Sequence, residues 1–516
     1  MRACRLFCFI VLTICAVRRA RAQSQAPDVY DVLPYSAVQS NGALASVTSY
    51  SGTPCTLTSP PPAACSTQLT QPANFQTLKS IVNLSSSLNS SIATALSVIP
   101  LASPASGVIT KIDPTTGAEL PSSSTLGPIF TERAETIGRR KFYIGISNQD
   151  FHFTSVNGQS LKTMTLLDPG GVTSNVEANG KFLTTVPTTF NVRADVRLSQ
   201  DVGFLTYGVT SRLDVSVGLP VVHAAVSSRT YNGLIYVGDG VGDQTGASQP
   251  NCWCANTFTP GSPPLSATGH VNGSGLSLPQ INYSNLAKTG FGDMLLRVKA
   301  NVLDGRKIAL AVGGDVRLPT GDERNFLGTG TWAVKPFGAL SFYTKPWSNG
   351  IVFSPHLNVG WQFAGQSILG GGINGATAVT VNGSPALGPP FTSSKDYLPD
   401  VFSWAVGSEV AFGRHNTVVV DILGNQIGWI HGIQNMVTQS VQNALPPQNA
   451  DVQATPVTIS GLVSAGRVSF GQYSGAFGYK ARILGDLVAT FNMLVRFDNN
   501  GLTARATPLF GLSYTF

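Results

Sequence analysis

The C-terminal segment places the strongest limit on what this chain can fold into. It runs from Thr503 to Phe516, with Phe510, Leu512 and Tyr514 falling on the same strand face as the terminal phenylalanine. Small and polar residues occupy the other face, and successive side chains of a strand point to opposite sides. Such a strand suits a wall between lipid and water. An aromatic terminal residue is typical of bacterial outer-membrane barrels, so we expect this strand to engage outer-membrane lipid and the barrel assembly machinery.

The N-terminus predicts export. Arg2 and Arg5 precede an apolar run over 6–17, and Ala20 and Ala22 frame a small-x-small cleavage site. This pattern indicates a signal peptide over 1–22, too short to span a membrane. The whole chain has 33 basic and 26 acidic residues, and the first 22 residues hold five arginines and no acid. Residues 23–516 therefore carry 28 basic against 26 acidic residues, which gives no reason to expect a nucleic-acid partner.

Cysteine usage agrees with an exported protein. Cys55, Cys65, Cys252 and Cys254 follow the signal peptide, an even number for a compartment that permits disulfides. Three connectivities remain open. No histidine or further cysteine lies at metal-ligand spacing, and no phosphate-binding loop occurs, so we expect neither a metal nor a cofactor.

Composition narrows the fold class. Only 11% of residues are charged, against roughly a quarter in typical soluble domains. No stretch after residue 22 reaches the about 18 apolar residues that a membrane helix requires. Alternating strands closed into a barrel offer such a chain another way to cross a bilayer.

Residues 23–138 form a separate Ser/Pro-rich region with one expected helix at about 74–99. Asn74 can cap this helix, and Leu78, Leu88, Ile92 and Leu96 lie on one stripe at helical spacing. The region is either a plug that packs in the pore or an amphipathic periplasmic segment that docks elsewhere.

Residues 139–516 change to a period of two and predict an all-β fold. We expect an antiparallel transmembrane β-barrel of about 12 strands, with 14 as the alternative because 160–186 could hold another hairpin. The expected strands lie at 141–153, 190–209, 213–221, 293–301, 308–318, 332–343, 353–363, 402–412, 417–425, 477–483, 487–497 and the C-terminus.

The connections between these strands alternate in length. Short turns fall at 210–212, 303–306, 345–349, 413–416 and 484–486, and long loops at 224–290, 364–400 and 429–465. Short turns at one end and long loops at the other are the outer-membrane arrangement. Both termini are then expected on the periplasmic side.

The more polar face of these strands is expected to line the lumen, because polar groups are costly in an apolar core. The lumen-facing candidates are Arg193, Arg197, Asp293, Arg297, Lys299, Asp315, Arg317, Lys335, His356, Glu409, Asp421, Arg482, Arg496 and Arg505. Their mixed charges indicate either a hydrated pore that mildly favours anions or an ion-paired filling that supports a plug.

Several short motifs resemble one known family. They are the hairpin from Tyr207 to Pro220, Gly290–Asp293 at a strand start, Arg317–Asp322, Leu327–Gly330 and the C-terminal Gly511–Phe516. Together they resemble the MetA-pathway of phenol degradation family, outer-membrane transporters related to the long-chain fatty acid transporter barrels. The resemblance covers about 140–516 and implies a channel for aromatic or other hydrophobic compounds. The long N-terminal region and the enlarged 224–290 loop depart from that family.

Three classes of function follow from these observations. The first is passive transport of small hydrophobic or aromatic compounds through the lumen of an outer-membrane barrel. The second is an adhesive or structural barrel that acts through its long loops. The third is an outer-membrane hydrolase, because Ser354, His356 and Asn358 share one strand face. That face is expected to point into the lumen and away from lipid, so we expect no enzyme.

Overall fold

The fold is taken from a computed structural model of the chain. It describes residues 26–36, 50–51, 66–69, 75–101, 103, 110–112, 119–121, 125–172, 174–175, 177–178, 181–182, 186–234, 282–305, 307–344, 347, 351–381, 384–413, 415–435, 439–441, 457–459 and 463–516. The expected signal peptide and the four candidate disulfide cysteines lie outside these residues.

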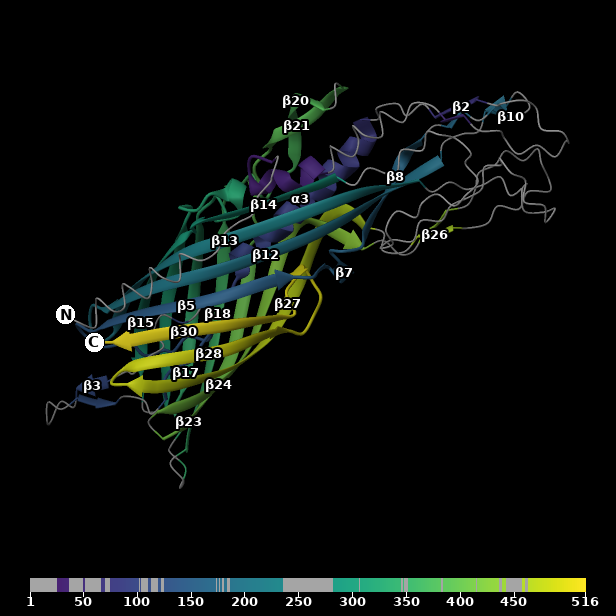
Figure 1. Cartoon of the computed structure of the whole chain (residues 1–516). Helices are drawn as coiled ribbons and strands as arrows, with labels where there is room; N and C mark the ends of the chain where they lie inside the picture. The colour runs from purple at the N-terminus through teal and green to yellow at the C-terminus, as the bar shows by residue number, and fades with distance from the viewer. Residues whose placement is uncertain are drawn as a thin grey trace.

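Twelve antiparallel strands close into a barrel (Figure 1). They are β5 (Phe142–Phe153), β12 (Val186–Gly208), β13 (Leu213–Leu234), β15 (Met294–Asp304), β16 (Ile308–Leu318), β17 (Ala333–Phe342), β18 (Ile351–Ala364), β23 (Val401–Phe412), β24 (Asn416–Asn435), β27 (Val463–Leu484), β28 (Leu487–Arg496) and β30 (Ala506–Thr515). The C-terminal strand β30 pairs with β5, and this pairing closes the barrel. The predicted all-β barrel of 12 strands is confirmed.

Two further strands lengthen one side of the wall. β12 and β13 are 23 and 22 residues long, so they extend beyond the ends of β5 and β15. β8 (Met164–Val172) pairs with the extension of β12, and β14 (Asn282–Phe291) pairs with that of β13. β8 lies in the stretch 160–186, which the alternative count of 14 strands had assigned to a further hairpin. The predicted loop at 224–290 is therefore partly strand, because pairing continues beyond the expected wall.

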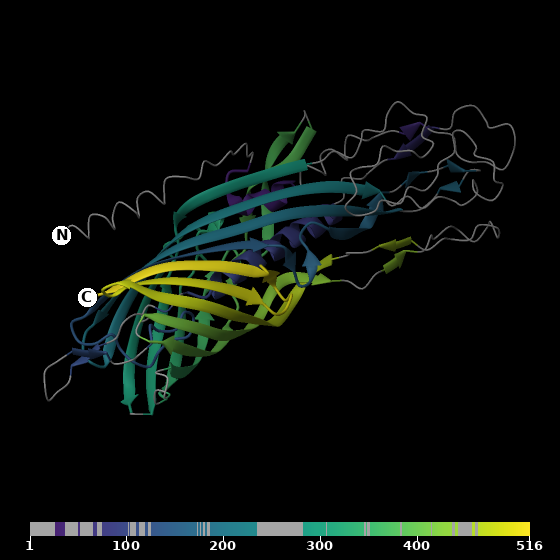
Figure 2. The same cartoon turned by 60° about the horizontal axis from the view of Figure 1, so that its bottom comes forward.

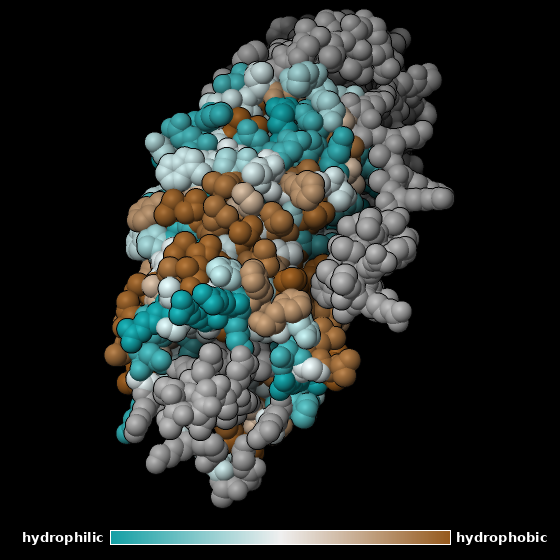
Figure 3. Space-filling model, turned by 90° about the vertical axis from the view of Figure 1, so that its left-hand side faces the viewer, coloured by the Kyte–Doolittle hydropathy of each residue, from teal (hydrophilic) through white to brown (hydrophobic). Residues whose placement is uncertain are grey.

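The outer face of the barrel is rich in exposed apolar side chains. On β5, Phe142 and Ile144 are exposed while Tyr143 and Ser147 are buried. On β30, Phe510 is 55% exposed, and the terminal Phe516 beside that strand is 63% exposed. Apolar side chains gather across the middle of the face in Figure 3, with hydrophilic side chains above them. The alternation that predicted the strands therefore also separates an outer apolar surface from the interior.

One long helix, α3 (Phe75–Val98), runs along the inside of the sheet in both cartoon views (Figures 1 and 2). Leu84, Leu88 and Ile92 on this helix are buried and belong to the main apolar cluster. The opposite face is also buried, and its hydroxyl groups bond back to the helix backbone, as when Ser91 Oγ donates to the Ser87 carbonyl at 2.8 Å. Among the described residues, no helix has the length and apolar character needed to cross a membrane.

The remaining elements are short. Two 3-10 helices, η1 (Val29–Asp31) and η2 (Glu323–Asn325), contact each other at the end of the barrel opposite the short turns. The small ladders are formed by β1 (Tyr50–Ser51), β2 (Ser66–Leu69) and β9 (Ser174–Asn175); β3 (Thr110–Ile112) and β4 (Glu119–Pro121); β6 (Ser155–Val156), β7 (Gln159–Ser160) and β29 (Leu502–Thr503); β10 (Glu177–Ala178) and β11 (Lys181–Phe182); β19 (Gln366–Ser367) and β22 (Asp396–Tyr397); β20 (Ile373–Val381) and β21 (Ser384–Ser393); and β25 (Gln439–Val441) and β26 (Val457–Ile459).

Candidate functional site: the filled lumen

An irregular segment, residues 125–137, crosses the barrel interior; we call it the lumen strap. Because its backbone forms no helix or strand, its buried N–H groups need partners from elsewhere. The wall supplies them. Backbone N–H groups of the strap donate to wall side chains at 2.9–3.1 Å in five places: Leu126 to Thr417, Gly127 to Glu409, Phe130 to Asp421, Ala134 to Ser341 and Ile137 to Asp214. These contacts fix the strap to four strands of the wall, β13, β17, β23 and β24.

A buried ion pair holds the centre of the strap. The Arg133 guanidinium donates to both carboxylate oxygens of Glu409, from Nε at 3.1 Å and from Nη2 at 2.7 Å. The two side chains are 1% and 0% exposed. His356 Nε2 lies 2.8 Å from Glu409 Oε1 but is not aligned for a hydrogen bond. On its other side, Nδ1 of His356 lies 2.9 Å from Ser341 Oγ.

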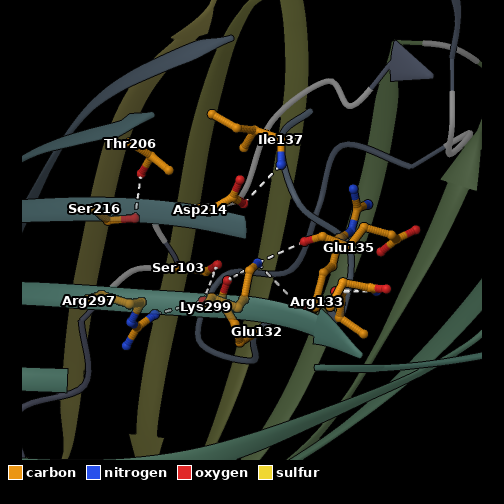
Figure 4. Close-up of polar contacts among 12 residues, drawn as sticks. Ser103, Glu132, Arg133, Glu135, Ile137, Thr206, Asp214, Ser216, Arg297 and Lys299 are labelled. Carbon is orange, nitrogen blue, oxygen red and sulfur yellow. Dashed lines mark hydrogen bonds and ion pairs between the residues drawn. The ribbon is translucent and has the colours of Figure 1, made fainter. Parts of the chain in front are cut away.

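A second charged group surrounds Glu132 (Figure 4). Lys299 Nζ donates to Glu132 Oε1 at 2.9 Å, and Arg297 Nη1 donates to Oε2 at 2.8 Å. Lys299 also reaches the carbonyl oxygens of Arg133 and Glu135. Both cations stand on β15, so one strand carries the positive charge that meets this strap carboxylate. Charge-assisted hydrogen bonds of this kind are stronger than neutral ones.

The strap also contacts β24 and β27. Phe130 N–H and the Thr131 hydroxyl both donate to the Asp421 carboxylate at 3.0 Å. Lys480 Nζ donates to the Pro128 carbonyl at 2.6 Å. Charged side chains on the inner face of the barrel therefore form hydrogen bonds and ion pairs with the strap. An ion-paired filling was one of the two alternatives that the sequence left open.

A cavity of about 160 Å³ remains between this filling and the wall. The end of α3, Phe130 and Glu132 line it from the inside. The wall contributes charged side chains from β15, β16 and β17, the ring of Phe337, and the amides of Asn358 and Gln362. The space is thus bounded by both aromatic and hydrogen-bonding groups.

The structure brings seven of the predicted lumen residues close to the strap or the cavity. They are Arg297, Lys299, Asp315, Lys335, His356, Glu409 and Asp421. Two others also face inward. Arg317 lines the cavity and donates to the Leu96 carbonyl of α3 at 3.1 Å, and Asp293 accepts hydrogen bonds from Gly321 and Thr329 of a connecting loop.

The remaining predicted residues lie elsewhere. On β12, Val192 and Val196 are buried, whereas Arg193 and Arg197 lie on the opposite face, where the Arg197 side chain is 58% exposed. The prediction reversed the two faces there, because the interior next to this part of β12 is an apolar core with α3 rather than water. Arg505 is also exposed, at the bend before β30.

Two more arginines pair close to their own strand ends. Arg482 contacts Asp486 at a short turn, and Arg496 Nη2 lies 2.8 Å from Asp498 Oδ1. Neither bonds to the strap among the contacts that the structure describes, so their predicted role in the lumen remains a prediction.

The three residues considered for a hydrolase lie on the inner face but form other contacts. Ser354 stands opposite Glu409 in the β18–β23 ladder, and Asn358 binds the backbone of Glu132. His356 instead contacts Ser341, whose hydroxyl is 0% exposed and accepts the Ala134 N–H. A substrate would have to displace the strap to reach this serine.

Sequence reasoning missed the strap residues Glu132 and Arg133. They lie in a Ser/Pro-rich region without strand or helix periodicity, so no pattern assigned their side chains to a face. The sequence did contain one signal, a local concentration of charge. Three of the four residues 132–135 are charged, namely Glu132, Arg133 and Glu135, although the surrounding region has few charged residues.

A segment at the far end of the lumen, residues 26–36, was also missed; we call it the mouth segment. Arg324 of η2 binds Asp28 at 2.6 Å and both oxygens of Asp31 at 3.0 Å. Burial raises the pKa of Asp31, and Arg324 opposes that rise. Tyr30 bonds to Ser393, so the segment is also tied to the loop strand β21.

Together these features define a closed β-barrel whose lumen is occupied by its own N-terminal chain. The sequence profile of the family described as "Putative MetA-pathway of phenol degradation" matches residues 176–367. This match confirms the resemblance that the turn motifs predicted, over the part of the wall from β12 to β18. A search of curated proteins finds no match.

A comparison with solved structures finds several likenesses at low sequence identity. An outer-membrane channel from Pseudomonas putida F1 shares 11% identity over 74% of this chain and 98% of its own, with a TM-score of 0.36. A FadL homologue from Pseudomonas aeruginosa shares 10% identity over 81% and 98%, with a TM-score of 0.27. The CymD monoaromatic hydrocarbon channel shares 12% identity over 73% and 88%, with a TM-score of 0.27.

Proposed function

We propose that this protein is an outer-membrane channel that lets small hydrophobic or aromatic compounds pass through the barrel lumen without an energy source. The observation that carries the proposal is the cavity of about 160 Å³ between the lumen filling and the wall. Its lining combines an aromatic ring with hydrogen-bonding groups, so it can hold a small aromatic solute. The match to a family described by phenol degradation supports aromatic solutes.

The outer surface supports a membrane location. Closure leaves no unpaired strand edge along the 12-stranded wall, and exposed apolar side chains surround it. The expected signal peptide would deliver the chain to the periplasm, where the C-terminal strand could engage the barrel assembly machinery. We therefore place the protein in the bacterial outer membrane, with the short turns and Phe516 facing the periplasm.

Passage requires the filling to move. The strap is held by separate polar contacts and small apolar clusters rather than by a continuous apolar core. Each hydrogen bond contributes about 0.5–1.5 kcal/mol net, or about 1.5–3 kcal/mol where one partner is charged. A shift of the strap can exchange some of these bonds for bonds to water. We propose that residues 125–137 are the gate and that the cavity beside them is a solute-binding site along the permeation pathway.

No hydrolytic activity is included in the proposal. The Ser341 hydroxyl is fully covered, and the nearby carboxylate of Glu409 is engaged by Arg133. We assign these residues to holding the strap.

The test is uptake of a radiolabelled aromatic solute by a Gram-negative host that expresses the full chain. The proposal predicts faster initial uptake than in cells with an empty vector. Ser403→Phe adds a ring to a residue that lines the cavity and should slow uptake. Ser211→Phe, at an exposed short turn, is the matched control and should not.

Two outcomes contradict the proposal. Equal uptake by the two phenylalanine variants would mean that the cavity is not on the route. No uptake above background for any aromatic or fatty solute would favour the adhesive or structural barrel instead.

A further inference from the structure

A row of three charges crosses the wall beside the cavity. Arg297 on β15 stands opposite Asp315 on β16, which in turn stands opposite Lys335 on β17. One carboxylate thus lies between two cations. Because opposite charges on facing strands attract each other, either cation could have taken this carboxylate.

Arg297 forms the hydrogen bonds to both oxygens of this carboxylate. Its Nε and Nη2 atoms donate to the two Asp315 oxygens at 2.6 and 2.8 Å. Among the described residues, no carboxylate oxygen lies within 4.0 Å of the Lys335 ammonium, and no hydrogen bond to it is found. The half-buried Lys335 therefore brings an unpaired positive charge to the cavity lining.

The neighbouring strand contributes a second unused donor. Gln362 on β18 lines the same cavity, and its buried Nε2 has no hydrogen-bond partner. The β17–β18 ladder pairs Val334 with Phe363 and Phe337 with Gly360, and the register of these pairs places Lys335 opposite Gln362. Buried donors are normally satisfied, so the unpaired Gln362 amide next to the Lys335 ammonium indicates an acceptor that comes from outside the chain.

The charge around the cavity favours an anion. Arg297, Arg317 and Lys335 line it, against Glu132 and Asp315. Arg317 donates to the carbonyl oxygen of Leu96 near the end of α3, while Arg297 and Lys299 engage the two carboxylates of the lining. The lining therefore has one more positive than negative side chain.

Size and aromatic lining limit the rest of the ligand. The cavity measures about 160 Å³, and an engineered protein cavity of about 150 Å³ is large enough to hold benzene. Phe337 lies on the wall and already stacks under the Arg297 guanidinium, 5.0 Å from the ring centre. Phe130 approaches from the strap. One aromatic ring fits such a space, whereas a long acyl chain does not.

We propose that this cavity binds a single-ring aromatic carboxylate. The Lys335 ammonium and the Gln362 amide N–H groups bind the carboxylate, and the ring lies beside Phe337. The proposal rests on the proposed function and narrows its solute class from aromatic compounds in general to aromatic acids. A neutral aromatic hydrocarbon would occupy the same space without satisfying the two donors, and a neutral amide would accept hydrogen bonds without neutralising the ammonium charge.

The test is equilibrium binding to the purified full chain in detergent, measured by calorimetry. The probes are benzoate and benzamide, which have nearly the same shape but differ in charge. Benzoate is expected to bind at least tenfold more tightly than benzamide. Lys335→Met should remove that preference, whereas Lys335→Arg should retain it. Lys307→Met, at an exposed residue beside a short turn, is the matched control and should leave both affinities unchanged.

Folding of each variant is checked by the heat-dependent electrophoretic mobility of the barrel. If Lys335→Met does not fold, Gln362→Leu replaces it, and benzoate affinity should fall several-fold while benzamide affinity stays the same. Equal binding of benzoate and benzamide to the unaltered chain overturns the proposal, as does a preference for benzoate that survives Lys335→Met.

The result is distinguishable from failure of the proposed function. If cells take up neutral aromatic solutes through the protein but the purified chain does not prefer benzoate, the channel proposal stands and the carboxylate site fails. If benzoate binds with the predicted preference but no aromatic solute enters cells, the site stands and the channel proposal fails.

Discussion

Replacing Arg133 by methionine should release the lumen strap from the wall. Arg133 makes two charge-assisted hydrogen bonds to Glu409, and both side chains are almost completely buried. Removing one partner of a buried pair typically costs about 3–5 kcal/mol, because the other charge is left uncompensated. Glu409 retains the Gly127 N–H at 3.0 Å and the nearby His356, so we expect the lower end of that range.

A cost of about 3 kcal/mol lowers the ratio of docked to undocked strap about 100-fold, since each 1.4 kcal/mol is a factor of ten. The assay is the single-channel current of the purified protein in planar bilayers, recorded as the fraction of time spent conducting. Arg505→Met, which removes an exposed arginine of the same chain, controls for the loss of a positive charge.

The double variant Arg133→Met with Glu409→Met gives a second check. Replacing a whole buried pair by apolar side chains is often close to neutral, so the double variant should conduct less often than Arg133→Met alone. The reasoning is refuted if Arg133→Met folds normally and conducts no more often than Arg505→Met.

Three further predictions concern the same filling. A Cβ at Gly407 would lie 2.0 Å from the Asp421 carboxylate, which holds the strap, so Gly407→Ala should raise the fraction of time spent conducting. Gly314→Ala, with open space around its Cβ, should not. Bilayer recordings of both variants check this. Glu132→Gln removes the carboxylate shared by two β15 cations, so reversal potentials should shift toward anion selectivity, and an unchanged potential would count against the described pairing. Burial raises the pKa of Asp31, so docking of the mouth segment should be firmest below about pH 4 and should weaken as the pH rises through the raised pKa. Asp31→Asn should remove this pH dependence. The mobility of a spin label attached to the mouth segment measures the docking.

The wall was predictable because its constraint is local. A strand between an apolar exterior and a filled interior must alternate, and this alternation marks the outward Phe510 and the inward Thr507 without any knowledge of partners. The helix was predictable for the same reason, since its stripe of apolar residues has helical spacing. Its observed bounds, Phe75–Val98, differ from the expected 74–99 by one residue at each end.

The contents of the lumen were not predictable in the same way. Alternation identifies two faces of a strand but does not say which one contacts water. Arg193 and Arg197 of β12 were therefore assigned to the barrel interior, although α3 makes the interior next to this strand apolar. The strap has no repeating pattern at all. Its position depends on backbone N–H groups meeting side chains such as Asp421 and Ser341, which come from strands far away in the sequence.

The central claim is that the N-terminal region fills the lumen and controls passage. It is tested most directly by comparing the single-channel conductance of the full chain with that of a chain in which residues 23–138 are deleted after the signal peptide. The account predicts a small or intermittent current for the full chain and a large, steady current for the deleted one. Equal conductance from two folded barrels would contradict it.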